Sequence, residues 1–279
     1  MIIGLAMLCG GASAGVFGSL LGLGGGVLIV PLLTFGFGLP LRDAIGVSLV
    51  CVIMTSSAAA GVYLERHVAN LRLGITLELF TALGALIGGS IAFLLDERVI
   101  SLLFAGLLVY VAVSMARARP AARSTASHAR STSNPAIGDD PVTVSPTMLD
   151  RLSGDDYRVR NLGRGVIGAA GAGVASAFFG IGGGVVKVPL MHLAMGVPLR
   201  VATATSNLMI GITAAAGALI YIVHGGVDPY VAGPTAIGVF LGATGGSRLS
   251  HRVNVSVLRA LFVVVLIYTA VRMLQRALT

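Results

Sequence analysis

The chain has 279 residues, of which 56% are hydrophobic and only 11% are charged, and its mean hydropathy is +0.93. Soluble domains carry about 25% charged residues, so the composition excludes an ordinary soluble protein and predicts an all-α membrane protein with several spans. The net charge of +8 would favour nucleic acid in a soluble chain. Here the arginines gather between apolar runs, so membrane topology explains the charge and no nucleic-acid partner is expected.

The first apolar run, residues 2–21, is expected to be a retained membrane span and not a cleaved signal. It ends in the glycine-rich segment 22–26, where we expect the helix to break because glycine costs about 1 kcal/mol in a helix interior. The following run, residues 27–37, contains Pro31. As a helix it would be about 17 Å long, roughly half of a bilayer.

The same pattern returns 158 residues later, at Gly180-Ile181-Gly182-Gly183-Gly184 and Pro189. An ungapped alignment of residues 15–48 with residues 173–206 matches 16 of 34 positions. The chain is therefore expected to consist of two homologous halves. Short hydrophobic segments interrupted by glycine and proline at matching positions of two repeats are typical of the discontinuous helices around a transport site.

Each half continues with a long helix rich in small residues, at 44–64 and 202–223, and then with two further apolar runs. Small residues allow membrane helices to pack closely, so these two helices are expected to be central. Between the halves, residues 117–160 hold few large apolar side chains and predict a flexible linker. The expected domains are an N-terminal repeat (1–116), this linker and a C-terminal repeat (161–279).

Five crossings in each half would place the two halves upside down relative to each other, which predicts two inverted-topology repeats of about five transmembrane segments. The alternative is eight spans and two re-entrant hairpins closed by the glycine turns. If both termini lie outside the cell membrane, fourteen arginines including those of the linker lie on the cytoplasmic side, against four outside. This bias agrees with the positive-inside rule and predicts a cytoplasmic linker.

The two glycine motifs, followed by Ala44 to Ser48 and by Ala202 to Ser206, resemble those of the TauE/SafE sulfite exporter family of membrane permeases. The resemblance covers both halves. It implies a permease for small sulfur-containing anions such as sulfite, sulfoacetate or a taurine-like sulfonate, with export as the expected direction. The coupling ion and the oligomeric state stay open, and a homo-oligomer is compatible with the sequence.

An oxyanion needs hydrogen-bond donors and positive potential, which the backbone N–H groups at the starts of the broken helices can supply. Arg200, at the start of a hydroxyl-rich helix, is the preferred direct contact. The alternative is that Arg200 and its counterpart Arg42 anchor the helices at the lipid interface. The predicted substrate-binding residues are Gly24, Gly25, Gly26, Arg42, Ser48, Gly182, Gly183, Gly184, Lys187, Arg200, Thr205, Ser206 and Asn207.

Three ionisable residues inside apolar runs are further candidates. Lys187 replaces Ile29 of the first half and either faces a functional site or extends to the interface. His192 and Glu78 are candidates for proton coupling, against packing or interfacial roles. The serines and threonines named above could equally hold helices together.

The spacing of nucleophiles, bases and nucleotide-binding motifs supports neither an enzyme nor an ATP-driven pump, and predicts no catalytic residue, metal or cofactor. The sequence therefore predicts a secondary transporter in a lipid bilayer that works by alternating access. The alternative is an anion channel of the same fold, in which the glycine turns line a continuous pore.

Overall fold

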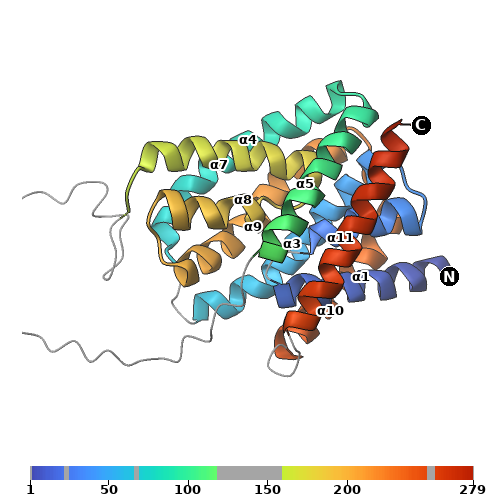
Figure 1. The fold of residues 1–279 in the computed structure, drawn as a ribbon, viewed down its shortest axis with the longest axis horizontal. Helices are drawn as coiled ribbons and strands as arrows, with labels where there is room; N and C mark the ends of the chain where they lie inside the picture. The colour runs from blue at the N-terminus through green and yellow to red at the C-terminus, as the bar shows by residue number, and fades with distance from the viewer. Residues whose placement is uncertain (1, 22–24, 66–68, 118–158, 250–254, 279) are drawn as a thin grey trace, which may run out of the picture.

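The protein is described by a computed structural model, which places residues 2–21, 25–65, 69–117, 159–249 and 255–278. All regular elements in these ranges are helical, as expected for an all-α membrane protein (Figure 1). Six of the described helices are long and apolar enough to cross a membrane. Three further apolar stretches are shorter: residues 3–19, 26–36 and 184–194.

The two halves contain the same elements in the same order. The first half consists of α1 (Ile2–Leu21), α2 (Gly26–Pro31), the π-helical turn η1 (Leu32–Gly36), α3 (Leu41–Glu65), α4 (Leu71–Leu94) and α5 (Glu97–Arg117). The second half consists of α7 (Leu162–Phe179), α8 (Gly184–Pro189), the π-helical turn η2 (Leu190–Ala194), α9 (Leu199–Val223), α10 (Pro229–Leu249) and α11 (Val255–Leu278). Most of the predicted linker, residues 118–158, lies outside the described residues.

Helix breaks occur where the glycines predicted them. Helix α1 ends at Leu21, and α2 begins after Gly25, which has a φ of 75°. In the second half α7 ends at Gly180, and α8 begins after Gly183, also with a φ of 75°. Side chains with a Cβ rarely adopt this left-handed conformation. The prediction of two short, discontinuous helices is therefore confirmed.

Extensive contacts join helices from different halves. Helix α1 packs against α10, α7 packs against α4, α5 packs against α11, and α3 packs against α9. Glycines bring the first two pairs into backbone contact, because a Cβ on Gly242 would collide with the Ala12 carbonyl and a Cβ on Gly173 would collide with the Thr81 carbonyl. The small-residue faces predicted from the sequence therefore hold the two halves together.

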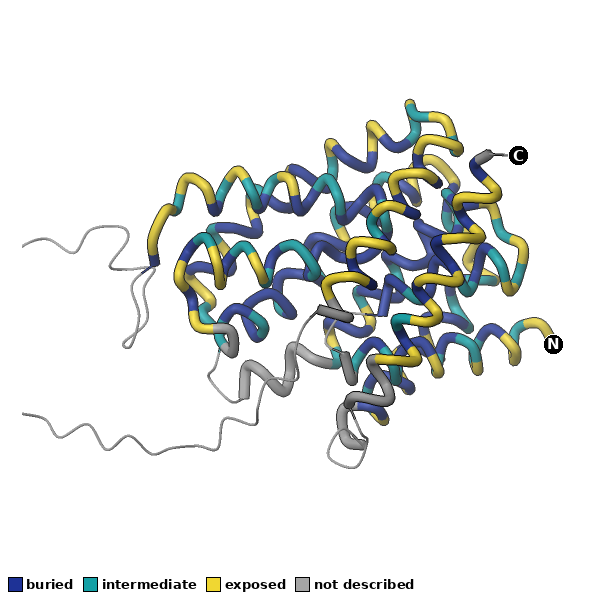
Figure 2. Tube along the Cα trace, in the orientation of Figure 1, coloured by how far each residue is buried: buried dark blue, intermediate teal, exposed yellow. Residues whose placement is uncertain are grey.

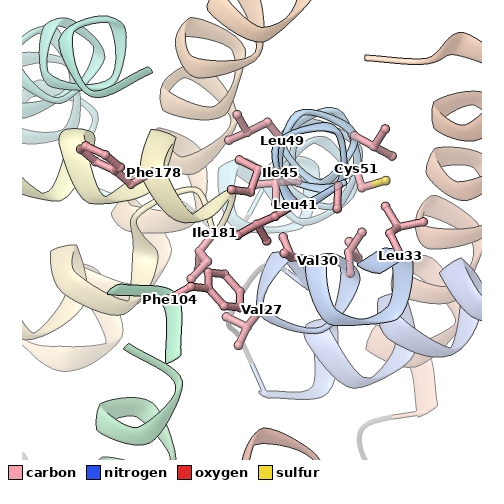
Figure 3. Packing of buried hydrophobic residues seen from close by; sticks show 14 of the residues in the cluster. Val27, Val30, Leu33, Leu41, Ile45, Leu49, Cys51, Phe104, Phe178 and Ile181 are labelled. Carbon is pink, nitrogen blue, oxygen red and sulfur yellow. The ribbon is translucent and has the colours of Figure 1, made fainter. Parts of the chain in front are cut away.

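The core surrounds α3 and α9, which are the most buried of the membrane-length helices (Figure 2). Figure 3 shows Val30 of α2 near Leu41 and Ile45 of α3, Val27 of α2 beside Phe104 of α5, and Ile181 of the second glycine turn close by. The outward faces of the surrounding helices carry exposed large apolar side chains, such as Leu79 and Ile87 on α4. This arrangement suits a lipid environment and leaves the polar groups of the interior to each other.

Candidate functional site

The two glycine turns meet at the centre of the molecule. A Cβ on Gly26 would collide with the carbonyl oxygen of Gly180, so the backbones of the two turns are in direct contact. The Ser48 hydroxyl lies between them, with its Oγ 2.8 Å from the Gly180 carbonyl oxygen and 3.3 Å from that of Gly26. In the first half, the hydroxyl therefore ties the two breaks together.

Ser206 has the same position in the second half but a different environment. It is 1% exposed, and its hydroxyl has no hydrogen-bond partner in the part of the chain that the structure describes. Its Oγ would lie 3.7 Å from a Cβ on Gly184. A second buried hydroxyl without a partner, that of Ser176 on α7, lies next to Gly183. Buried polar groups normally find a partner, so two unpartnered hydroxyls at one turn indicate a place for a ligand.

Lys187 projects from α8 into the interior beside these serines. Its side chain is 1% exposed, and its Nζ lies 3.1 Å from Oε2 of Glu78 on α4. Thr213 on α9 completes the cluster, since its Oγ1 is 2.5 Å from Lys187 Nζ and 2.6 Å from Glu78 Oε1. A Cβ on Gly183 would lie 3.5 Å from Lys187 Cε, so the cluster borders the glycine turn.

Burying an ion pair costs several kcal/mol per ion in lost hydration, which the attraction between the partners repays only in part. Ionisable groups inside membrane helices therefore generally mark substrate or ion pathways. The first half has Ile29, fully buried, at the position of Lys187. The lysine of the cluster therefore has no counterpart in the first half, which contributes Glu78 instead.

Three of the other predicted residues lie near the start of α9. Thr205, Ser206 and Asn207 are all buried. The Thr205 hydroxyl accepts a hydrogen bond from the Asn70 backbone N–H at 2.9 Å, and the Asn207 carbonyl accepts one from Ser56 at 2.5 Å. These contacts show helix-joining roles for Thr205 and for the Asn207 backbone.

Arg42 lies at the start of α3, beside the end of α4. Its guanidinium donates to the backbone carbonyl of Leu95 at the end of α4 and lies 5.7 Å from the centre of the Phe93 ring. Beside it, Glu97 Oε1 accepts a hydrogen bond from the Leu41 backbone N–H at 3.0 Å and lies 3.8 Å from Arg276 on α11. These contacts give the Arg42 guanidinium partners within the protein.

The remaining candidates are His192, Gly24 and Arg200. His192 is exposed, with Nδ1 2.9 Å from the Val197 carbonyl oxygen. The side chain of Arg200 and the residue Gly24 lie outside what the structure describes, so their roles stay predictions. Within the described ranges, no three His, Cys, Asp or Glu side chains gather as a metal site would require.

Sequence reasoning missed Thr213 and Ser176. Thr213 follows Ser206 by seven residues, so the two lie on the same face of α9 two turns apart. Ser176 lies on α7, four residues before the end of that helix at Gly180. The helical periodicity of hydroxyl residues could have indicated Thr213, whereas nothing in the sequence pattern connects Ser176 with Gly183.

A largely apolar cavity of about 420 Å³ lies elsewhere, between α1, α2, η1 and α11. Its lining includes Phe17, Leu28, Phe35, Leu261 and Tyr268. None of the polar groups described above lines this cavity.

A multi-pass helical membrane protein with a buried charged cluster at broken helices has the features of a transport protein. A family model described as sulfite exporter TauE/SafE matches residues 7–273. The chain therefore belongs to the TauE/SafE family of membrane transporters. The resemblance noted from the glycine motifs is confirmed.

Relatives cover nearly the whole chain. The probable membrane transporter protein YunE of Bacillus subtilis is 27% identical and covers 92% of each chain. A probable membrane transporter protein of Xylella fastidiosa is 30% identical, covering 95% of this chain and 94% of its own. A third, MJ0441 of Methanocaldococcus jannaschii, is 28% identical over 76% of this chain and 70% of its own. No solved structure matches the chain significantly.

Proposed function

We propose that this protein is a secondary transporter of small sulfur-containing anions, such as sulfite or an organosulfonate, and that it works as an exporter by alternating access. The observation that carries the proposal is the group of buried donors at the second glycine turn. Lys187 supplies a positive charge, and the partnerless hydroxyls of Ser176 and Ser206 supply hydrogen bonds. An oxyanion requires this combination of charge and donors.

The positive-φ turn at Gly182 and Gly183 supports access to these donors. Glycines lack the side chains that would otherwise shield the backbone, so an anion can come close to the turn. Arg200 is proposed to assist at the start of α9. The substrate site is thus assigned to Gly182, Gly183, Gly184, Lys187, Ser206 and Arg200, with Ser176 added.

The repeat organisation suits alternating access. We propose that the two halves are inverted in the membrane, with the linker in the cytoplasm and both termini outside the cell membrane. The pairing of α1 with α10 and of α7 with α4 supports this, because each contact has an equivalent with the halves exchanged. Rocking one half against the other would then expose the glycine turns to the two sides in succession.

Counterflow in proteoliposomes tests the proposal. The purified protein is reconstituted with unlabelled sulfite, sulfoacetate or taurine inside the vesicles, and labelled substrate is added outside. A transporter gives transient accumulation of label by exchange, whereas an anion channel gives none. Absence of exchange with all three compounds, in vesicles that contain correctly folded protein, would contradict the proposed function.

A further inference from the structure

The Glu78 carboxylate accepts hydrogen bonds from Lys187 and Thr213, as an oxyanion substrate would. The carboxylate uses one oxygen, Oε2, for the Lys187 ammonium at 3.1 Å and the other, Oε1, for the Thr213 hydroxyl at 2.6 Å. The three residues come from α8, α4 and α9, and all three are buried. A carboxylate and a sulfonate accept hydrogen bonds from the same donors, so the two compete for one ammonium.

We propose that Glu78 is an internal oxyanion, which the transported anion displaces from Lys187, and that the released carboxylate takes up one proton. The protein would then carry one proton together with each monovalent anion. This inference rests on the transport function proposed above. The net charge of the site is the same in both states. The empty site holds the Lys187 ammonium and the ionised Glu78, and the loaded site holds the ammonium, the anion and neutral Glu78. Each state therefore has zero net charge.

The proton follows from the burial of the cluster. If Glu78 stayed ionised on release, one ammonium would face two anions in an interior from which water is excluded, and an unpaired buried charge is costly. Protonation removes this cost, and the neutral carboxyl can keep its hydrogen bond with Thr213. In the described cluster, Lys187 is the one cation available to offset a second anion.

The other ionisable groups on the elements around Glu78 are few, and Arg72 of α4 is exposed. Helix α7 contributes Arg164, which is exposed near its start. Helix α9 contributes Arg200, thirteen residues or about 20 Å of helix before Thr213, and Tyr221, whose hydroxyl donates to the Ala177 carbonyl at 3.0 Å. His192 of η2 bonds to Val197 instead. Glu78 is therefore the group whose protonation accompanies anion binding.

Two consequences follow for the substrate. A site with a single cation favours monovalent anions, such as an alkyl sulfonate or hydrogen sulfite, over the sulfate dianion. Transport should also be electroneutral, so that the concentration gradients of anion and proton set its direction and the membrane potential does not. An anion produced inside the cell would leave together with a proton.

The experiment follows proton and anion together in proteoliposomes. A pH indicator is trapped inside the vesicles, and a gradient of methanesulfonate is imposed in either direction. The membrane potential is varied separately with potassium and valinomycin. For the wild-type protein, we expect one proton to move with each anion, at a rate that the potential does not change. Anion movement without protons, or a rate that follows the potential, would overturn the inference without any variant.

Glu78→Gln provides the second arm, because glutamine keeps the shape but cannot ionise. Exchange of labelled methanesulfonate should persist in this variant, and its rate should no longer fall between pH 6 and pH 8. Binding at pH 8 should tighten at least about tenfold, as expected if the released state is populated one time in ten or less in the wild type. Unchanged affinity together with wild-type pH dependence would contradict the displacement by Glu78.

Glu97→Gln is the matched control. Glu97 is a second carboxylate that binds a backbone N–H and approaches an arginine, but it is 43% exposed and lies away from the turn. This variant should retain proton coupling and pH dependence. If neither the wild type nor Glu78→Gln exchanges methanesulfonate or the three compounds named above, the proposed transport function is wrong. If the wild type transports an anion but no proton moves with it, only the role proposed for Glu78 is wrong.

Discussion

Ser48 and Ser206 occupy the same position in the two halves, yet only Ser48 is engaged, with its hydroxyl 2.8 Å from the Gly180 carbonyl oxygen. The Ser206 hydroxyl, equally buried, has no partner in the described residues. One serine therefore holds the two turns together, and its counterpart is the one that we propose binds the anion. This difference between two matched positions leads to the first prediction.

Ser206→Ala should weaken anion binding and leave stability nearly unchanged. Hydrogen bonds to charged groups contribute about 1.5–3 kcal/mol, which corresponds to a loss of affinity of roughly 10- to 150-fold. Ser48→Ala should instead lower the free energy of unfolding by about 1–3 kcal/mol, because it leaves the buried Gly180 carbonyl without its donor. Thermal unfolding with and without sulfite separates the two effects; equal effects of both substitutions on affinity would contradict the assignment.

Lys187→Met should abolish anion binding and also destabilise the fold. Removing one partner of a buried ion pair costs about 3–5 kcal/mol, because Glu78 remains buried without its counter-charge. The double variant Lys187→Met with Glu78→Gln should recover much of the stability but not the binding. Differential scanning calorimetry and titration with sulfite test both parts. Anion binding by the double variant at wild-type affinity would remove Lys187 from the site.

Arg200→Ala should reduce anion affinity by tenfold or more, as expected for the loss of a guanidinium contact with an oxyanion. Arg42→Ala is its counterpart in the first half. That variant should leave affinity intact and lower thermal stability, because Arg42 bonds to the Leu95 carbonyl. Isothermal titration with sulfite decides between them. If Arg200→Ala binds as the wild type does, Arg200 is not part of the substrate site.

Gly26→Ala should disrupt the junction of the two turns, because the added methyl group collides with the Gly180 carbonyl. Gly38→Ala serves as the control. Gly38 has a φ of 70° with nothing within 4 Å of an added Cβ, so its substitution should cost only about 1–2 kcal/mol of backbone strain. Folded yield after membrane extraction should fall sharply for Gly26→Ala and slightly for Gly38→Ala. Similar yields for both would argue against the contact.

The linker gives a test of topology. Cysteines introduced at Ser127 and Ser133, in a chain with the exposed Cys9 replaced by serine, should react in intact cells only with membrane-permeant maleimides. Cys51 is buried and should stay unreactive. Labelling by an impermeant reagent would place the linker outside and reverse the proposed orientation of both halves.

The helix breaks were predictable because glycine and proline act locally. Three consecutive glycines destabilise a helix whatever surrounds them. The same glycine pattern occurs in both halves, which supports the prediction twice. The central position of α3 and α9 was likewise predictable from their many small residues. The pairing of particular helices was not, since it depends on how the two halves fit together in space.

The charged cluster lay beyond sequence reasoning for a related reason. Lys187 and Glu78 were both recognised as unusual, but they are 109 residues apart and belong to different halves. The packing of α4 against α7 and α9, both of which contact α8, brings the two side chains to 3.1 Å. Arg42 and Arg200 looked equivalent in sequence. The structure gives Arg42 a backbone carbonyl and an aromatic ring to bind, which no local pattern could reveal.

The pairing of α1 with α10 has a consequence for how the protein is made. Helix α1 leaves the ribosome more than 200 residues before its partner, and its glycine face can be covered only when α10 arrives. The first half therefore cannot complete its packing during its own synthesis. The first half has to wait in the membrane, with its glycine surfaces against lipid or the insertion machinery, until the second half closes over it.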